Sequence, residues 1–144
     1  MQVDDLRITK LRNYLINIIN TLTTNRKFQI NANMLSNDPN NYSLDKMPTE
    51  TQVMKWITGT VIRKDVYSFR SRMAYSQDTA NNLKNIGFFE QFENAIKTNN
   101  EQGVRPDIEN IEKIECLNPG TMIANQDGKT AEFEIQIQIT YRED

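Results

Sequence analysis

Few residues in this chain have side chains that could support chemistry. Histidine is absent from all 144 residues, and Cys116 is the single cysteine. Because imidazole is the usual general base and the commonest metal ligand, its absence excludes most hydrolase triads and zinc sites. Glu112 and Glu115 stand next to Cys116, and negative charge raises the pKa of a thiol rather than lowering it. We therefore predict that Cys116 is a structural thiol in the core or at a sheet edge.

A Gly-Lys-Thr sequence at 128–130 superficially resembles a phosphate-binding loop. That motif requires a glycine-rich loop that enters a helix. Here Asp127 and Gly128 are typical of a hairpin turn, and they lead into an alternating segment instead. The acidic pairs at 4–5 and 143–144 are predicted to be solvated. The sequence therefore indicates no catalytic, cofactor-binding or metal-binding residues, and we predict that the protein is not an enzyme.

Basic and aromatic residues alternate within one segment: Arg63, Lys64, Arg70 and Arg72 with Tyr67, Phe69 and Tyr75. Such a mixture on one surface is typical of proteins that bind single-stranded nucleic acid. In a strand, however, successive side chains point to opposite faces, so the aromatic rings and the arginines Arg70 and Arg72 separate. We predict a basic stripe that faces solvent or another subunit. The net charge of −2 also argues against a general binder of nucleic acid or membrane surfaces.

Two segments have the apolar spacing of amphipathic helices. Residues 4–22 place apolar side chains three and four positions apart, and residues 78–99 return to the same spacing, with Asp78 as the predicted N-cap. Gly87 lies inside the second segment, which favours a break between two short helices. Strands are expected at 27–35, 53–64, 65–76, 111–117 and 121–124. Within them, Trp56 is predicted to lie in the core, and Gly59 to form a bulge or a close approach of the backbone.

Residues 130–142 show the clearest pattern in the chain. Phe133, Ile135, Ile137 and Ile139 point one way, and the intervening Glu, Gln and Thr residues point the other way. A period of two predicts a strand with one apolar and one hydrated face, paired through a turn at 125–129 with residues 121–124. The polar face would be open to water, line a channel or pair with a neighbour.

Residues 36–50 contain Asn, Asp and Pro in a density that indicates a loop. We expect Tyr42, Leu44 and Met47 to anchor this loop to the body. Because structureless loops of this length are usually functional or disordered, we predict an arm that contacts a neighbouring subunit or a further component of an assembled particle. The order of elements predicts a single α+β domain over 1–144, in which an antiparallel sheet carries the N-terminal helix and the central helical segment on one face.

Four segments in this order resemble a family of small virion proteins of tailed phages and prophages of Gram-positive bacteria, often labelled minor capsid proteins and similar to tail terminators. The segments are "YSLDKMPTE" (42–50), "FRSRMAYSQD" (69–78), "NIGFFEQFENAI" (85–96) and "AEFEIQIQITYRE" (131–143). The resemblance covers roughly 40–144. The chain departs from the family in the low aromatic content after Phe92.

The resemblance implies a protein of the virion neck, assembled in the bacterial cytoplasm without a membrane partner or a cofactor. It would form a ring, usually a hexamer, that stops polymerisation of the tail tube protein and contacts the head connector. DNA would pass through the lumen without sequence-specific binding. The alternatives are another neck protein, such as a head-completion or head–tail joining protein, and a non-viral ligand-binding or regulatory module. Eight residues are candidates for the assembly interface: Tyr42, Leu44, Asp45, Met47, Arg70, Arg72, Gln136 and Gln138.

Overall fold

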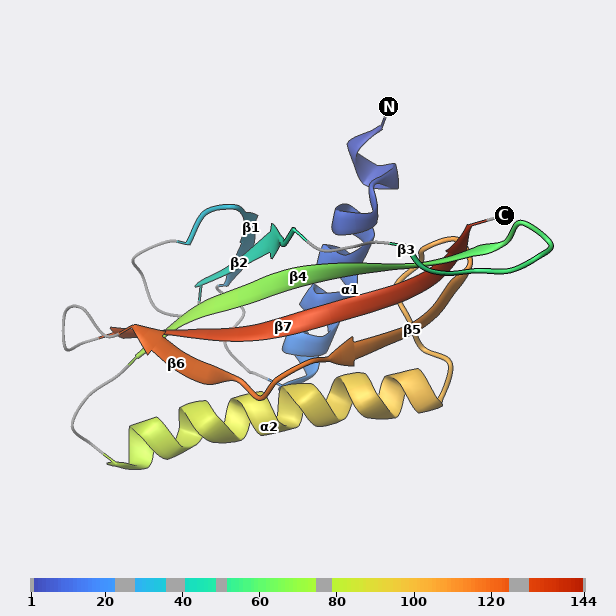
Figure 1. The fold of residues 1–144 in the computed structure, drawn as a ribbon. Coiled ribbons are helices and arrows are strands. Elements are labelled where there is room, and N and C mark those ends of the chain that lie inside the picture. Colours follow the sequence, from blue (N-terminus) through green and yellow to red (C-terminus); the bar gives the residue numbers. More distant parts are fainter. Residues whose placement is uncertain are drawn as a thin grey trace.

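The computed structural model describes residues 2–22, 28–35, 41–48, 52–74, 79–124 and 130–143. Within them two α-helices lie on a seven-stranded, mostly antiparallel sheet, which confirms the predicted α+β class (Figure 1). In chain order the elements are the short 3-10 helix η1 (Val3–Asp5), α1 (Arg7–Leu22), β1 (Gln29–Ala32), β2 (Asn41–Lys46), β3 (Gln52–Lys55), β4 (Val61–Ala74), α2 (Thr79–Glu101), β5 (Ile111–Cys116), β6 (Thr121–Ala124) and β7 (Thr130–Glu143).

Two long strands form the centre of the sheet. β4 and β7 pair antiparallel along their whole length, from Val61 opposite Glu143 to Ala74 opposite Thr130. β2 and β3 pair with different parts of the other edge of β4, and β5 and β6 do the same along β7. β1 adds to β2 in the parallel direction. The β4–β7 pair therefore sets the length of the molecule.

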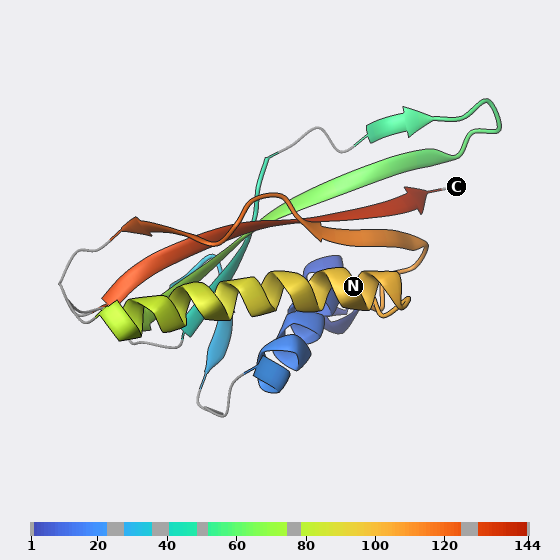
Figure 2. The ribbon, with the colours of Figure 1, turned by 90° about the horizontal axis from the view of Figure 1, so that it is seen from below.

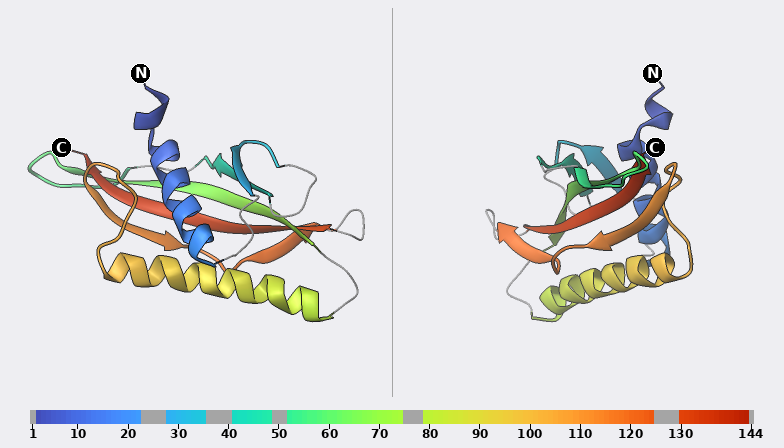
Figure 3. Two further views of the ribbon diagram at one scale, coloured as in Figure 1. Left: turned by 180° about the vertical axis from the view of Figure 1, so that it is seen from behind. Right: turned by 45° about the vertical axis from the view of Figure 1, so that its right-hand side comes forward.

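The predicted alternation of β7 is confirmed. Phe133, Ile135, Ile137 and Ile139 are at most 6% exposed, and they face the helices. Both helices pack on this one face of the sheet (Figures 2 and 3). β6 pairs with β7 as expected, while the predicted turn at 125–129 lies outside the described residues. The core is completed by Leu11, Leu15, Ile18 and Ile19 of α1, Phe89, Phe92 and Ile96 of α2, and Tyr67 and Phe69 of β4.

The predicted loop at 36–50 is wrong for its middle part. Residues 41–46 form β2, in which Tyr42 and Leu44 are 3% and 1% exposed and lie opposite Ser71 and Phe69 of β4. The Tyr42 ring stacks on Phe69, with ring centroids 5.3 Å apart. Tertiary pairing thus overrides the turn propensity of the surrounding Asn and Asp residues. Residues 36–40 and 49–50 lie outside the described residues.

The predicted strands at 53–64 and 65–76 divide at a different place. The chain turns at Trp56–Thr60, so that β3 and β4 form a hairpin. The Trp56 N–H donates to the Thr60 carbonyl at 2.8 Å, and the Gly59 N–H donates to the Trp56 carbonyl at 2.9 Å. Gly59 has a φ of 95°, which a side chain would disfavour. Gly59 is therefore a turn residue rather than a bulge, and Trp56 is 46% exposed instead of buried.

α2 runs without a break through Gly87, contrary to the prediction. Glycine costs about 1 kcal/mol relative to alanine inside a helix. Phe89, Phe92 and Ile96 follow within the next turns and are at most 2% exposed against the sheet, and the burial of these large side chains outweighs that cost. Asp78, the predicted N-cap, lies outside the described residues.

Candidate functional site

One face of the sheet is left uncovered by the helices described, and it is turned toward the viewer in Figure 1. We call it the open face. It is built by the even-numbered residues of β4 and β7 with their register partners on β2 and β5, because alternate side chains of a strand point to opposite faces. Its polar side chains include Ser43, Asp45, Lys64, Arg70, Arg72, Lys113, Glu115, Glu132, Glu134, Gln136, Gln138 and Thr140.

Arg70 lies at the centre of a network that joins three strands of the open face. Its Nε donates to Asp45 Oδ2 of β2 at 2.8 Å, and its Nη1 donates to Glu132 Oε1 of β7 at 3.1 Å. Ser43 Oγ donates to Asp45 Oδ1 at 2.7 Å. The three charged side chains are between 15% and 28% exposed, so solvent only partly screens these pairs. One guanidinium thus pairs with two carboxylates.

A second set of contacts runs from β7 to β5. Gln138 Nε2 donates to Glu115 Oε1 at 2.7 Å, and Lys113 Nζ lies 3.5 Å from the same oxygen. Further along β7, Gln136 Nε2 donates weakly to Glu134 Oε1 at 3.5 Å. The side chains are therefore held to one another across and along the strands. The open face thus carries several charges that are compensated within the chain.

The structure brings together five of the eight candidate interface residues. Asp45, Arg70, Arg72, Gln136 and Gln138 all lie on the open face. Arg72 Nη1 donates to Thr130 Oγ1 at 3.3 Å. Gln138, at 9% exposed, contributes little surface.

Two of the other three candidates, Tyr42 and Leu44, do not belong to this face, and Met47 follows the end of β2. Tyr42 and Leu44 alternate with Ser43 and Asp45 along β2, so their side chains point to the helix side of the sheet. They are core residues and offer no surface to another subunit. Met47 is half-buried, and its N–H donates to the Val66 carbonyl at 2.9 Å.

The predicted separation of aromatic rings from arginines is confirmed for the described residues, while Tyr75 lies outside them. Tyr67 and Phe69 are buried under the helices, while Arg70 and Arg72 lie on the open face. The basic residues do not form a single stripe, however. Arg63 is an odd-numbered residue of β4, so its side chain points to the helix side of the sheet. It pairs with Glu143 at the end of the β4–β7 ladder.

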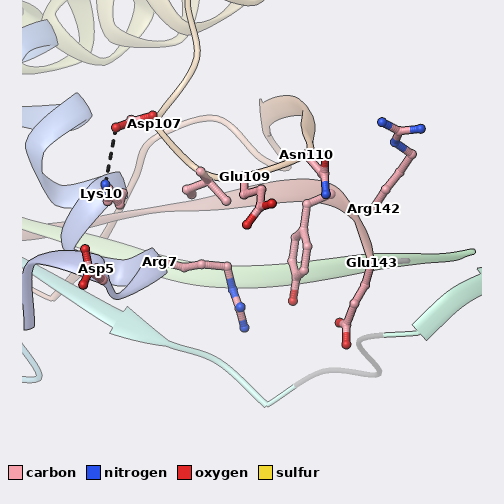
Figure 4. Close-up of a pocket in the computed structure, with 10 residues that line it drawn as sticks. Asp5, Arg7, Lys10, Asp107, Glu109, Asn110, Arg142 and Glu143 are labelled. Atoms are coloured by element: carbon pink, nitrogen blue, oxygen red, sulfur yellow. Dashed lines mark hydrogen bonds and ion pairs between the residues drawn. The ribbon is translucent and has the colours of Figure 1, made fainter. Parts of the chain in front are cut away.

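A charged cavity of about 880 Å³ opens where the N-terminal part of α1, the turn at 107–110 and the end of β7 meet (Figure 4). Lys10 Nζ lies 3.3 Å from Asp107 Oδ2, and the Arg7 guanidinium lies 4.7 Å from the centre of the Tyr141 ring. The lining therefore holds cations that already have partners within the chain. Sequence reasoning missed this cavity because its residues come from three segments that no motif connects.

Arg7 also reaches a buried carboxylate beneath the cavity. Its Nε donates to Asp65 Oδ2 at 3.0 Å, and Lys46 Nζ lies 4.0 Å from Asp65 Oδ1. Asp65 is fully buried on the helix side of β4, whereas both cations are about half exposed. Because a buried carboxylate without a partner is strongly destabilising, this contact fixes the start of α1 to the sheet.

Cys116 lies half-buried on the edge strand β5, as predicted. Burial, and then the charges of Glu93 and Glu115, raise the pKa of its thiol to about 12. A thiol with this pKa is almost entirely protonated at neutral pH and is a poor nucleophile. The described part of the chain contains no group of three His, Cys, Asp or Glu side chains that could hold a metal ion, and none of its helices is long and apolar enough to cross a membrane.

A comparison of the sequence with protein-family models and with curated proteins found no match.

Proposed function

We propose that this protein is a structural component of a phage tail or a tail-like particle, and that it forms a homo-oligomeric ring of the tail-terminator type. In this proposal the ring, usually of six copies, caps the head-proximal end of the tail tube and stops its polymerisation. Its partners are further copies of itself, the tail tube protein and the proteins of the head connector. The protein acts in the neck of the virion and needs no catalytic residue.

The observation that carries the proposal is the charge balance of the open face. Its cations are Lys64, Arg70, Arg72, Arg142 and Lys113, and its anions are Asp45, Glu115, Glu132 and Glu134. Arg142 pairs with Glu112 of β5 at 3.5 Å. Each phosphate that a protein neutralises with an uncompensated cation increases the affinity of the protein for DNA. Three of the five cations, Arg70, Lys113 and Arg142, are paired with carboxylates of the same chain, so the face offers DNA few free cations. Such a face suits a channel through which DNA must slide.

The test is to combine the purified protein with the tail tube protein from the same genome. We expect ring-shaped particles in negative-stain images, a solution mass of several copies, and tubes that stop growing once the protein is added. As a control, the Val104→Asp variant should behave as the unaltered protein does, because Val104 is an exposed apolar residue away from the open face. A protein that stays monomeric and leaves tube lengths unchanged would overturn the proposal.

The same experiment separates the two alternatives. Another neck protein would form rings or bind the connector without stopping tube growth. A ligand-binding module would remain monomeric, and its ligand would have to displace the internal partners of Lys10 and Arg7 in the charged cavity. The compensated lining of that cavity therefore favours the assembly function over the ligand-binding one.

A further inference from the structure

The turn between β3 and β4 carries two large apolar side chains into solvent. Trp56 is 46% exposed and Ile57 is fully exposed, at 107%. We call these two residues the hairpin tip. In Figures 1 and 2 the turn projects beyond the rest of the sheet. Two backbone hydrogen bonds close the turn, so the tip is presented on an ordered support rather than on a loose loop. Neighbouring exposed apolar residues on such a projection mark an interaction site.

A second exposed apolar surface lies at the other end of the molecule. We call it the α2–β6 patch, formed by Leu83 (60% exposed), Ile86 (51%) and Met122 (49%). Met122 stands opposite Phe133 in the β6–β7 register, and the Phe133 ring centroid lies 5.2 Å from that of Phe89, one turn after Ile86. Figure 1 shows β6 above the N-terminal half of α2. The patch therefore joins one flank of α2 to the edge strand β6.

Acidic residues continue this flank of α2. Glu90 and Glu93 follow Ile86 by four and seven positions, which places them on the same side of the helix. Glu93 also lines a small cavity with Glu115 and Cys116 of β5, so this flank faces the β5–β6 edge. Burial, and then the neighbouring Glu90, raise the pKa of Glu93. At the opposite end, the exposed Lys55 directly precedes the hairpin tip. Lys97 lines the same small cavity as Glu93, so this flank of α2 carries two acidic residues and one basic residue. The two surfaces are thus apolar at their centres, and their adjoining charges are opposite on balance.

The hairpin tip and the α2–β6 patch cannot meet within one molecule. β3 pairs with β4 at residues 61–63, whereas β6 pairs with β7 at residues 132–134, near the other end of the same ladder. At roughly 3.3 Å per residue, the two ends of the ladder are about 40 Å apart. The continuous hydrogen bonding of β4 to β7 prevents the chain from folding back on itself. A second copy, in contrast, always carries the complementary surface.

We propose that the hairpin tip of one copy docks on the α2–β6 patch of the next copy. This contact would join neighbouring copies in the ring, so it rests on the proposed function. It is heterologous, because two different surfaces meet, and heterologous contacts produce a closed ring when the rotation between copies closes. Tryptophan is among the residues that contribute most at the centres of interfaces, and its burial beside Ile57 anchors the contact.

The test uses two single variants of the full chain, Ile57→Asp at the hairpin tip and Ile86→Asp in the α2–β6 patch. Both positions are at least half exposed, so circular dichroism and thermal melting should match the wild type. In sedimentation velocity and negative stain, we expect rings from the wild type and from the Val104→Asp control. Each of the two variants alone should be monomeric, because each lacks one half of the contact.

The decisive measurement is an equimolar mixture of the two variants. Ile57→Asp keeps an intact patch and Ile86→Asp keeps an intact tip, so the mixture contains one functional contact and should form dimers but no rings. A contact between two identical tips predicts instead that Ile86→Asp alone forms dimers, because both of its copies keep an intact tip. Rings from either variant alone, or a mixture that stays monomeric, would overturn the proposed contact and leave the ring function standing. A monomeric wild type would overturn the ring function itself.

Discussion

At the scale of single residues, Arg70 links β2 to β7 across the open face, because its guanidinium binds both Asp45 and Glu132. Replacement by alanine would leave two partly buried carboxylates facing each other without a cation. For Arg70→Ala we expect a loss of about 1–3 kcal/mol in the free energy of unfolding, measured by urea denaturation.

A second variant distinguishes the network from simple packing. Removing one carboxylate together with the cation, in Arg70→Ala/Glu132→Gln, should recover part of the lost stability. An unchanged unfolding free energy in Arg70→Ala would show that solvent already screens these pairs. A double variant that is less stable than Arg70→Ala would instead indicate that Glu132 stabilises the sheet through other contacts.

The open face shows how far residue types can predict a site. Arg70, Arg72, Gln136 and Gln138 come from strands with clear alternation, so their common face follows from parity alone. The pairing of Asp45 with Arg70 depends on the register of β2, which no local pattern contains. The charged cavity depends on the meeting of three distant segments, and it could not be predicted for the same reason.

At the scale of elements, β7 offers a direct comparison of its two faces. Ile137 is fully buried opposite Tyr67 and Cys116, whereas the adjacent Gln136 lies half-buried on the open face. Ile137→Asp should cost at least about 3 kcal/mol, because it places a charge without a partner in the core. Gln136→Asp is the matched control and should change stability by no more than about 1 kcal/mol. Equal melting temperatures for the two variants would contradict the register.

The sequence predicted the long elements α1 and β7 from their period, and it also predicted the short strands β5 and β6, which the turn residues at 118–120 separate. α1 and β7 repeat their pattern over many residues, so one unfavourable residue changes little. β2 is short and follows Asn and Asp residues, so that turn propensity dominates the local pattern. The β3–β4 turn lies in a run of β-branched residues that is typical of a continuous strand. Gly59, which has a positive φ in the structure, is the glycine in that run that indicates a turn.

At the scale of the whole molecule, buried acidic groups predict how stability depends on pH. Burial raises the pKa of Tyr14, Tyr42, Tyr67 and Tyr141, and it raises that of Cys116 to about 12. The unfolded chain loses these protons near the ordinary values of 9.0 for the thiol and 10.0 for the phenols. Stability from these groups is therefore complete below pH 9 and declines as the pH rises above it.

Melting temperatures at pH 8, 9.5 and 10.5 measure this effect, and we expect a progressive fall. Tyr42→Phe removes one of the buried phenols, so its melting temperature should depend less steeply on pH. A melting temperature that stays constant between pH 8 and pH 10.5 would contradict the burial of these groups.

The order in which the strands follow one another has a consequence for the speed of folding. β7 comes after all the other described strands in sequence, yet it lies between β4 on one side and β5 and β6 on the other. Its partners on β4 are 56 residues away at Ala74–Thr130 and 82 residues away at Val61–Glu143. Closing such distances costs chain entropy before any contact repays it, so domains of this kind fold in milliseconds to seconds rather than in microseconds. Until β7 is in place, an edge of β4 is exposed to other chains, and slow folding makes the newly made subunit vulnerable to aggregation.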